Sequence, residues 1–200
     1  MKKNNYFLNF LSSYHNIFLK VLWFELYYSI HFREILPKIK IQNSSDRTDT
    51  VPCVYYFLHE ISKFIKEKNI KSVVDIGSGY GRVVNFISLK NKIKCYGIEY
   101  DREVFKSALK QKKNKVYFYY GNVLTFNFKK LKTNCFILVD PFKKVKDQKK
   151  FLYKIKKISP GKKKYIISIN ISKKKFSNEF KLIRSINGSE TRTLKIFEFS

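Results

Sequence analysis

A glycine-rich turn is the most chemically informative part of the sequence. The segment Val73–Val83 reads Val-Val-Asp-Ile-Gly-Ser-Gly-Tyr-Gly-Arg-Val. Its β-branched residues predict a strand buried on both faces, and Gly77, Gly79 and Gly81 permit a sharp turn that brings the backbone close to a ligand. The helix expected next offers unpaired backbone N–H groups. These features predict a binding site for a nucleotide-like cofactor.

The turn departs from the fingerprint of dinucleotide-binding proteins. That fingerprint is G-x-G-x-x-G, whereas the spacing here is G-x-G-x-G, with Arg82 at the position of the third glycine. Asp75, at the end of the expected strand, would repel a phosphate but could accept hydrogen bonds from a cationic amino-acid group. We therefore expect a cofactor without a pyrophosphate, and S-adenosylmethionine has the required cationic group.

Further strands are expected downstream, and each ends in polar or glycine residues. The strand in Lys94–Asp101 carries Glu99, about 20 residues beyond the turn, where an acid would bind ribose hydroxyls. Lys115–Tyr120 and Cys135–Val139 are expected to form the next strands, which are followed by Gly121-Asn122-Val123 and by Asp140-Pro141-Phe142. The carboxyl ends of parallel strands share one edge of a sheet, so the site is predicted there.

The order of these motifs resembles that of class I S-adenosylmethionine-dependent methyltransferases. Asp75 to Gly81 is similar to the first motif of that family, Glu99 to its ribose-binding acid, and Gly121-Asn122-Val123 to its adenine-contacting Gly-Asp-Ala segment. Asn122 in place of the usual Asp keeps an acceptor but loses charge. The resemblance implies S-adenosylmethionine as the cofactor and a set of cofactor-binding residues: Asp75, Gly77, Ser78, Gly79, Tyr80, Gly81, Glu99, Tyr100, Asn122 and Val123. No metal site is expected, because the cysteines lack the spacing of metal ligands.

The resemblance also implies the fold. Ser159-Pro160-Gly161, before a strand expected over Tyr165–Ile171, is similar to a turn of the family, and Phe180–Ile186 with Thr191–Phe199 is typical of a hairpin. We expect an α/β fold with a doubly wound, mostly parallel seven-stranded sheet and an antiparallel C-terminal hairpin. Residues 50–200 would form the methyltransferase domain, and residues 1–49 an aromatic-rich helical extension and linker.

Asp140, Pro141 and Phe142 are the candidate catalytic residues. Methyl transfer requires orientation of donor and acceptor and exclusion of water. Asp140 could accept a hydrogen bond from the acceptor or take its proton, Pro141 would fix the turn, and Phe142 would offer an aromatic face. The alternative is that Asp140-Pro141 only turns the chain.

The sequence leaves the identity of the methyl acceptor open. Thr50-Val51-Pro52, the glycine turn and Asp140-Pro141-Phe142 together resemble small bacterial methyltransferases with Val-Pro-Thr and Asn-Pro-Phe segments, some from polysaccharide clusters. A group of small protein-lysine methyltransferases has the same layout. A protein lysine, a sugar or polysaccharide precursor, a nucleobase and a small metabolite are all compatible N or O acceptors.

The formal net charge of +27 suggests an anionic partner such as nucleic acid or a membrane surface. Nearly all of the positive charge comes from lysine, however. The lysine content is high together with the contents of Ile, Asn, Phe and Tyr, which is typical of A/T-rich codons. We therefore expect only weak, non-specific nucleic-acid binding. An anionic substrate is the alternative, held by lysines expected at the site edge: Lys143, Lys144, Lys146 and Lys173 to Lys175.

The N-terminal segment Tyr6–Leu36 is rich in aromatic residues and predicts a helix. Lys20 and Glu25 interrupt its apolar stretch, which is too short for a membrane span, and it lacks the features of a signal peptide. Two interpretations remain: a helix that packs on the domain or on a partner, and a helix that lies in a membrane interface. The isolated Cys53, Cys95 and Cys135 are typical of core thiols in a reducing compartment, so a cytoplasmic location is expected.

Two other classes of protein are compatible with parts of the pattern. A dinucleotide-dependent oxidoreductase shares the basic fold but conflicts with Arg82 and with the C-terminal hairpin. A catalytically silent subunit with the cofactor-binding fold could bind a partner through its aromatic N-terminus. Binding of S-adenosylmethionine separates the methyltransferase from both.

Overall fold

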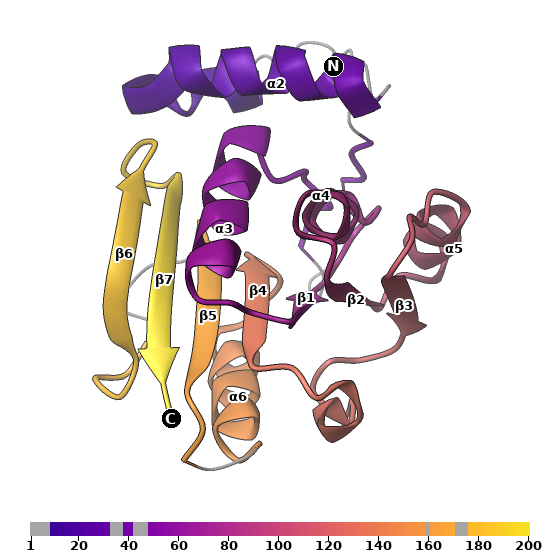
Figure 1. The fold of residues 1–200 in the computed structure, drawn as a ribbon, viewed down its shortest axis with the longest axis vertical. Coiled ribbons are helices and arrows are strands. Elements are labelled where there is room, and N and C mark those ends of the chain that lie inside the picture. The colour runs from indigo at the N-terminus through magenta and orange to yellow at the C-terminus, as the bar shows by residue number, and fades with distance from the viewer. Residues whose placement is uncertain (1–8, 33–37, 42–47, 159–160, 171–175) are drawn as a thin grey trace.

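A computed structural model describes the chain except for residues 1–8, 33–37, 42–47, 159–160 and 171–175 (Figure 1). Seven strands form one sheet in the order β3-β2-β1-β4-β5-β7-β6. Their bounds are β1 (Ser72–Ile76), β2 (Lys94–Glu99), β3 (Val116–Tyr120), β4 (Cys135–Val139), β5 (Lys164–Ile169), β6 (Lys181–Asn187) and β7 (Thr193–Phe199).

The strands pair as the sequence predicts. β1 pairs in parallel with β2 and β4, with Asp75 opposite Gly97 and Ile137, and β3 and β5 extend the parallel sheet on either side. β7 runs antiparallel between β5 and β6. A mostly parallel sheet with an antiparallel C-terminal hairpin is thus confirmed, and the strand order reverses between β1 and β4, where ligands bind in such folds.

Helices cover both faces of the sheet. The named helices of the described residues are η1 (His15–Ile17), α2 (Phe18–Phe32), α3 (Tyr55–Glu67), α4 (Arg82–Asn91), α5 (Arg102–Lys110), η2 (Phe128–Leu131) and α6 (Val145–Lys156). The helix expected after the glycine turn, α4, begins at Arg82, because Gly79 and Gly81 take φ values of +53° and +87° and form the turn itself. Asp101 caps α5 by accepting hydrogen bonds from the backbone N–H groups of Glu103 and Val104.

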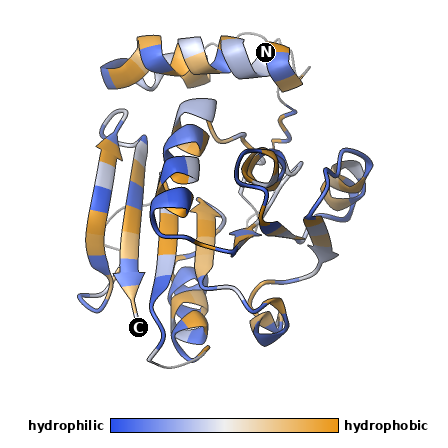
Figure 2. Cartoon of the chain, viewed as in Figure 1, coloured by the Kyte–Doolittle hydropathy of each residue, from blue (hydrophilic) through white to orange (hydrophobic). Residues whose placement is uncertain are grey.

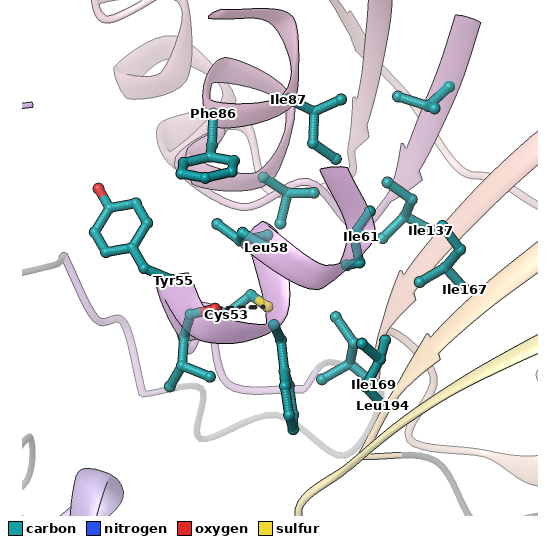
Figure 3. Close-up of a cluster of buried hydrophobic side chains, with 14 of the residues drawn as sticks. Cys53, Tyr55, Leu58, Ile61, Phe86, Ile87, Ile137, Ile167, Ile169 and Leu194 are labelled. Carbon is teal, nitrogen blue, oxygen red and sulfur yellow. Dashed lines mark hydrogen bonds between the residues drawn. The ribbon is translucent and has the colours of Figure 1, made fainter. Parts of the chain in front are cut away.

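The hydrophobic core lies on both faces of the sheet, because alternate strand residues point to opposite sides. On one face, Leu58 and Ile61 of α3 and Phe86 of α4 pack toward Ile137 and Ile167 (Figure 3). On the other, the neighbouring strand residues face α6 and η2, and β4 is hydrophobic along its whole length (Figure 2). The buried strands hold their carboxyl ends in fixed positions, and those ends carry the candidate site.

The N-terminal segment folds onto this framework. The helix expected over Tyr6–Leu36 is interrupted in the structure, where η1 precedes α2, while Tyr6, Phe7 and Leu36 lie outside the described residues. α2 packs on α3 and lies across the end of the sheet toward which β4 and β5 point (Figure 1). Within the described ranges, no helix is long and apolar enough to cross a membrane.

A buried ion pair ties α2 to the glycine turn. Glu25 of α2 accepts a hydrogen bond from Arg82 Nη2 at 2.7 Å, and the two side chains are only 4% and 7% exposed. The second Glu25 oxygen accepts from the backbone N–H of Tyr55 at 2.6 Å, and Arg82 Nη1 donates to the carbonyl of Cys53 at 2.9 Å. The Arg82 guanidinium also lies 3.8 Å from the Tyr55 ring centre. Arg82 therefore joins the turn to α2, to the start of α3 and to the segment before it.

This arrangement predicts a large loss of stability for Glu25→Ala. The change would remove the Glu25 carboxylate from the buried Arg82 cation, and breaking a buried pair in this way typically costs roughly 3–5 kcal/mol of unfolding free energy. Urea denaturation measures it. Glu103→Ala is the control, since it removes a Lys40 ion pair whose acid is 85% exposed, and pairs of that kind are worth about 0–1 kcal/mol. Equal losses in the two variants would contradict the anchoring role of Glu25.

Candidate functional site

A cavity of about 460 Å³ opens at the carboxyl ends of β1, β2 and β4. Its volume falls in the range of ligand pockets, roughly 300–1,000 Å³. The turn after β1, the end of β2, the segments after β3 and β4, and residues 48–53 form its walls. Cofactor residues expected from the sequence that line it are Asp75, Gly77, Ser78, Gly79, Tyr80, Glu99, Tyr100, Asn122 and Val123.

Backbone hydrogen bonds and positive φ angles fix the glycine turn. The N–H groups of Gly77 and Ser78 both donate to the carbonyl of Ile98, at 2.9 and 3.0 Å. Gly77 has φ +70°, and a Cβ there would lie 3.0 Å from the Cβ of Pro141. Gly81 does not line the cavity; a Cβ there would meet the Phe118 ring at 2.4 Å. Gly81 therefore allows the turn to pack closely against Phe118, outside the cavity.

Asp75 is the most unusual group in the cavity. It is 1% exposed, and no described residue donates a hydrogen bond to its Oδ1. Burial, with a smaller contribution from the negative charge of Glu99, raises the pKa of Asp75 to about 8. A buried acceptor without a donor is costly unless a ligand or water satisfies it. A cationic donor in the cavity would stabilise the ionised carboxylate.

Glu99 braces the turn from the neighbouring strand. Its Oε2 accepts a hydrogen bond from the backbone N–H of Gly79 at 2.8 Å, and its Oε1 accepts from the N–H groups of Tyr100 and Asp101, each at 2.8 Å. Burial raises the pKa of Glu99, and these backbone donors partly offset that rise. A carboxylate has about four acceptor positions. One position therefore remains for a donor in the cavity.

The other predicted cofactor residues form the outer part of the cavity. Tyr80 is partly buried, and Lys38 Nζ lies 5.8 Å from its ring centre. Tyr100 is half exposed. The Oδ1 of Asn122 accepts a hydrogen bond from the backbone N–H of Leu124 at 2.9 Å, so this side chain also shapes the loop after β3.

The three candidate catalytic residues do not lie together. Pro141 and Phe142 line the 460 Å³ cavity, whereas Asp140 lines an adjoining cavity of about 330 Å³. Phe142 is mostly buried, and its ring centre lies 5.4 Å from that of Phe151, so it is largely a core residue. The two cavities share the wall residues Thr48, Asp49, Val51, Pro52 and Val139.

The adjoining cavity has polar and charged walls. Besides Asp140, it is lined by Asp49, Lys143, Asn170 and Arg192. Asp140 and Asn170 follow β4 and β5 and take positive φ angles of 43° and 61°. This left-handed conformation turns the chain sharply at the ends of both strands.

The sequence did not predict several residues of this region. Thr50 packs against the turn, since a Cβ on Gly79 would lie 2.8 Å from its Cγ2. Arg82, read only as a departure from a dinucleotide motif, lines the main cavity, and Arg192 and Asn170 line the second. For Thr50, the resemblance of Thr50-Val51-Pro52 to a segment of known methyltransferases was a signal. No local sequence pattern indicates the positions of Arg82, Asn170 and Arg192. Of the lysines expected at this edge, Lys143 and Lys144 line the cavities, and Lys173 to Lys175 lie outside the described residues.

Comparison with protein-family models and with curated protein sequences found no match. Many solved structures are similar in fold. A putative RNA methyltransferase from Pyrococcus horikoshii matches 86% of this chain and 96% of its own, with a TM-score of 0.61 and 20% sequence identity. An RNA methyltransferase from Salinibacter ruber, solved with S-adenosyl-L-homocysteine, matches 74% of this chain and 94% of its own, with a TM-score of 0.58 and 19% identity.

A putative caffeoyl-CoA O-methyltransferase from Staphylococcus aureus is similar over 75% of this chain and 86% of its own, with a TM-score of 0.57 and 17% identity. These neighbours differ in the acceptors that their names give, but they share the sheet that carries the cavity described above. The chain therefore has the Rossmann-like fold of class I S-adenosylmethionine-dependent methyltransferases.

Proposed function

We propose that the protein is a methyltransferase that takes a methyl group from S-adenosylmethionine and transfers it to an N or O acceptor. The observation that carries the proposal is the buried Asp75 carboxylate, which lies in the cavity beside the glycine turn and accepts no hydrogen bond from the described residues at Oδ1. The α-ammonium group of S-adenosylmethionine is cationic and would supply the missing donor. The S-adenosyl-L-homocysteine held by the neighbour from Salinibacter ruber has the same amino-acid part and supports this reading.

The residues around the cavity suit the rest of this cofactor. Glu99 retains an acceptor position for a ribose hydroxyl, and Asn122, Val123 and Tyr100 border the part of the cavity expected for adenine. The glycine turn lets the backbone approach the ligand closely. When bound, S-adenosylmethionine supplies an electrophilic methyl group on a sulfonium sulfur.

The acceptor side of the mechanism belongs to the adjoining cavity. Asp140 would accept a hydrogen bond from the acceptor N–H or O–H, or take its proton. The shared wall, which includes Val139 and Pro52, would limit the access of water between the two cavities. Lys143 and Arg192 could neutralise an anionic acceptor, so a substrate that carries negative charge is compatible with this cavity. A protein lysine, a sugar, a nucleobase and a small metabolite remain the candidate acceptors.

Proton release on cofactor binding tests the role of Asp75. With a pKa of about 8 in the free protein, Asp75 is mostly protonated near neutral pH, and a bound cation should lower that pKa and expel the proton. Titration calorimetry with S-adenosyl-L-homocysteine, near pH 7 in buffers of different ionisation enthalpy, should detect release of about one proton. Affinity should therefore rise as the pH increases toward 8.

Asp75→Asn is the matched control, because it keeps the shape of the side chain and cannot ionise. It should release no proton and lose the rise of affinity with pH. If the wild-type protein bound the ligand with no proton release, the assignment of Asp75 to the cation would fail. If it bound neither S-adenosylmethionine nor its demethylated product, the chain would be a catalytically silent relative.

Glu99→Ala should weaken cofactor binding by roughly 1–3 kcal/mol, the usual scale for losing hydrogen bonds to a charged group. Because Glu99 also holds three backbone N–H groups, thermal unfolding must be measured in parallel. Glu99→Gln, which keeps one acceptor oxygen, should bind the cofactor with intermediate affinity. Unchanged affinity in both variants would mean that Glu99 only braces the turn.

Variants of Asp140 separate chemistry from backbone structure. Asp140→Gly suits the positive φ angle and removes the carboxylate, so it should keep cofactor affinity and lose methyl transfer by about 10²-fold or more. Transfer of radiolabelled methyl groups from the cofactor measures this. Asp140→Asn keeps an acceptor but cannot take a proton, so activity in this variant would indicate orientation of an amine. Full activity in Asp140→Gly would leave Asp140 as a turn residue only.

A further inference from the structure

The helix α2 is apolar on two opposite sides. Its inner side packs on the domain through Val21, Glu25 and Tyr28, which are buried. Its outer side exposes a row of large apolar side chains, each 52% to 79% accessible: Leu19, Trp23, Leu26, Tyr27 and Ile30. These residues recur at helical spacing along one side of the helix. We call this row the α2 outer face.

Such a face needs an explanation. Single exposed apolar residues are normal, but a contiguous exposed row marks an interaction surface. An α-helix that is hydrophobic all round is normally buried. Apolar residues extend along the length of α2 (Figure 2). The α2 outer face is therefore a candidate interaction surface.

The charges indicate which kind of partner. The sequence carries a net charge of +27. On α2 itself the exposed ionisable residues are Lys20 and His31, while its sole acid, Glu25, is buried and paired with Arg82. Glu190, in the turn between β6 and β7, is an exposed acid on a segment that contacts η1. A second copy of so basic a chain would be repelled, whereas an anionic surface would be attracted.

The side chains of the α2 outer face favour lipid over RNA. Leu19, Leu26 and Ile30 have no ring that could stack on a base. Aliphatic side chains do gain free energy when they leave water for the acyl region of a bilayer. Trp23 and Tyr27 are residue types enriched at the membrane–water interface, and lysines interact with anionic headgroups.

We propose that the α2 outer face docks the protein onto an anionic membrane surface. The helix would lie in the interface plane without crossing the bilayer, with Leu19, Trp23, Leu26 and Ile30 inserted among the lipids. Because α2 lies across the end of the sheet toward which β4 and β5 point, docking would turn the edge with the two cavities toward the membrane side (Figure 1). The proposal does not depend on the activity proposed above.

Trp23 is the protein's single tryptophan and lies in the proposed contact, so its fluorescence is a direct reporter. The full chain is titrated with vesicles of phosphatidylcholine alone and with vesicles that contain one third phosphatidylglycerol. Anionic vesicles should shift the emission to shorter wavelength and increase its intensity, and lipids brominated on the acyl chains should quench it. Neutral vesicles should bind much more weakly, and added salt should weaken the anionic binding.

A pair of double variants separates apolar docking from charge attraction. Leu26→Glu with Ile30→Glu keeps Trp23 and should reduce the vesicle partition coefficient at least about ten-fold. Leu109→Glu with Tyr153→Glu is the control, because it makes the same change of charge at exposed apolar residues of α5 and α6. It should lose less than about three-fold in partition, because these two positions lie outside the proposed contact and salt screens their charges from the bilayer.

Several results would overturn the proposal. Unchanged Trp23 emission with anionic vesicles would exclude insertion of the α2 outer face. Equal losses of the partition coefficient in the two double variants would mean that the protein binds the vesicles by charge attraction alone. A Trp23 emission that depended on protein concentration without lipid, and became independent of it in Leu26→Glu/Ile30→Glu, would identify a second copy of the chain as the occupant. A shift produced by RNA and not by vesicles would assign the surface to nucleic acid.

Discussion

The architecture of the N-terminal half depends on one buried cation, Arg82. Its guanidinium lies at the first residue of α4, directly after the glycine turn, and binds the Glu25 carboxylate, the Cys53 carbonyl and the face of the Tyr55 ring. A buried ion pair is stable only when its hydrogen-bonding groups are well matched, and here both groups have additional partners. The pair therefore holds α2, the segment before α3 and the turn in one geometry. Displacement of any one of them would expose a charge to an apolar surrounding.

Two buried acidic residues, Asp75 and Glu99, determine the electrostatics of the main cavity. Asp75 and Glu99 end adjacent strands, and burial raises the pKa of both. Glu99 is compensated by three backbone donors, but Asp75 is not compensated by described residues at one oxygen. The two carboxyl groups thus have different roles. Glu99 maintains the shape of the turn, and Asp75 retains a buried acceptor atom that a donor in the cavity can satisfy.

Much of this could be predicted from the sequence, because strand ends are local features and parallel strands bring them together. Asp75 and Glu99 lie near the ends of recognisable strands, the glycine turn and Asn122 follow such strands, and all of them line the cavity at one edge. The contacts of Arg82 could not be predicted, since Glu25 is far away in the sequence and no periodicity links the two. The placement of Asp140 in a different cavity from Pro141 and Phe142 could not be predicted either, because it depends on how the chain leaves β4, where Asp140 takes a left-handed conformation.

That conformation has a consequence for how the acceptor side of such a site can change in evolution. Left-handed φ angles at the ends of β4 and β5 are tolerated well by Gly, Asn and Asp and poorly by most other residues. The backbone at Asp140 and Asn170 therefore favours Gly, Asn and Asp, although Lys92, Lys115 and Lys132 take similar φ angles elsewhere in the chain. An exchange of Asp and Asn at either position would alter the charge of the cavity by one unit and would suit the same backbone conformation. One base change separates the codons of Asp and Asn, so the charge that an acceptor would meet at the position proposed for Asp140 can change in a single evolutionary step.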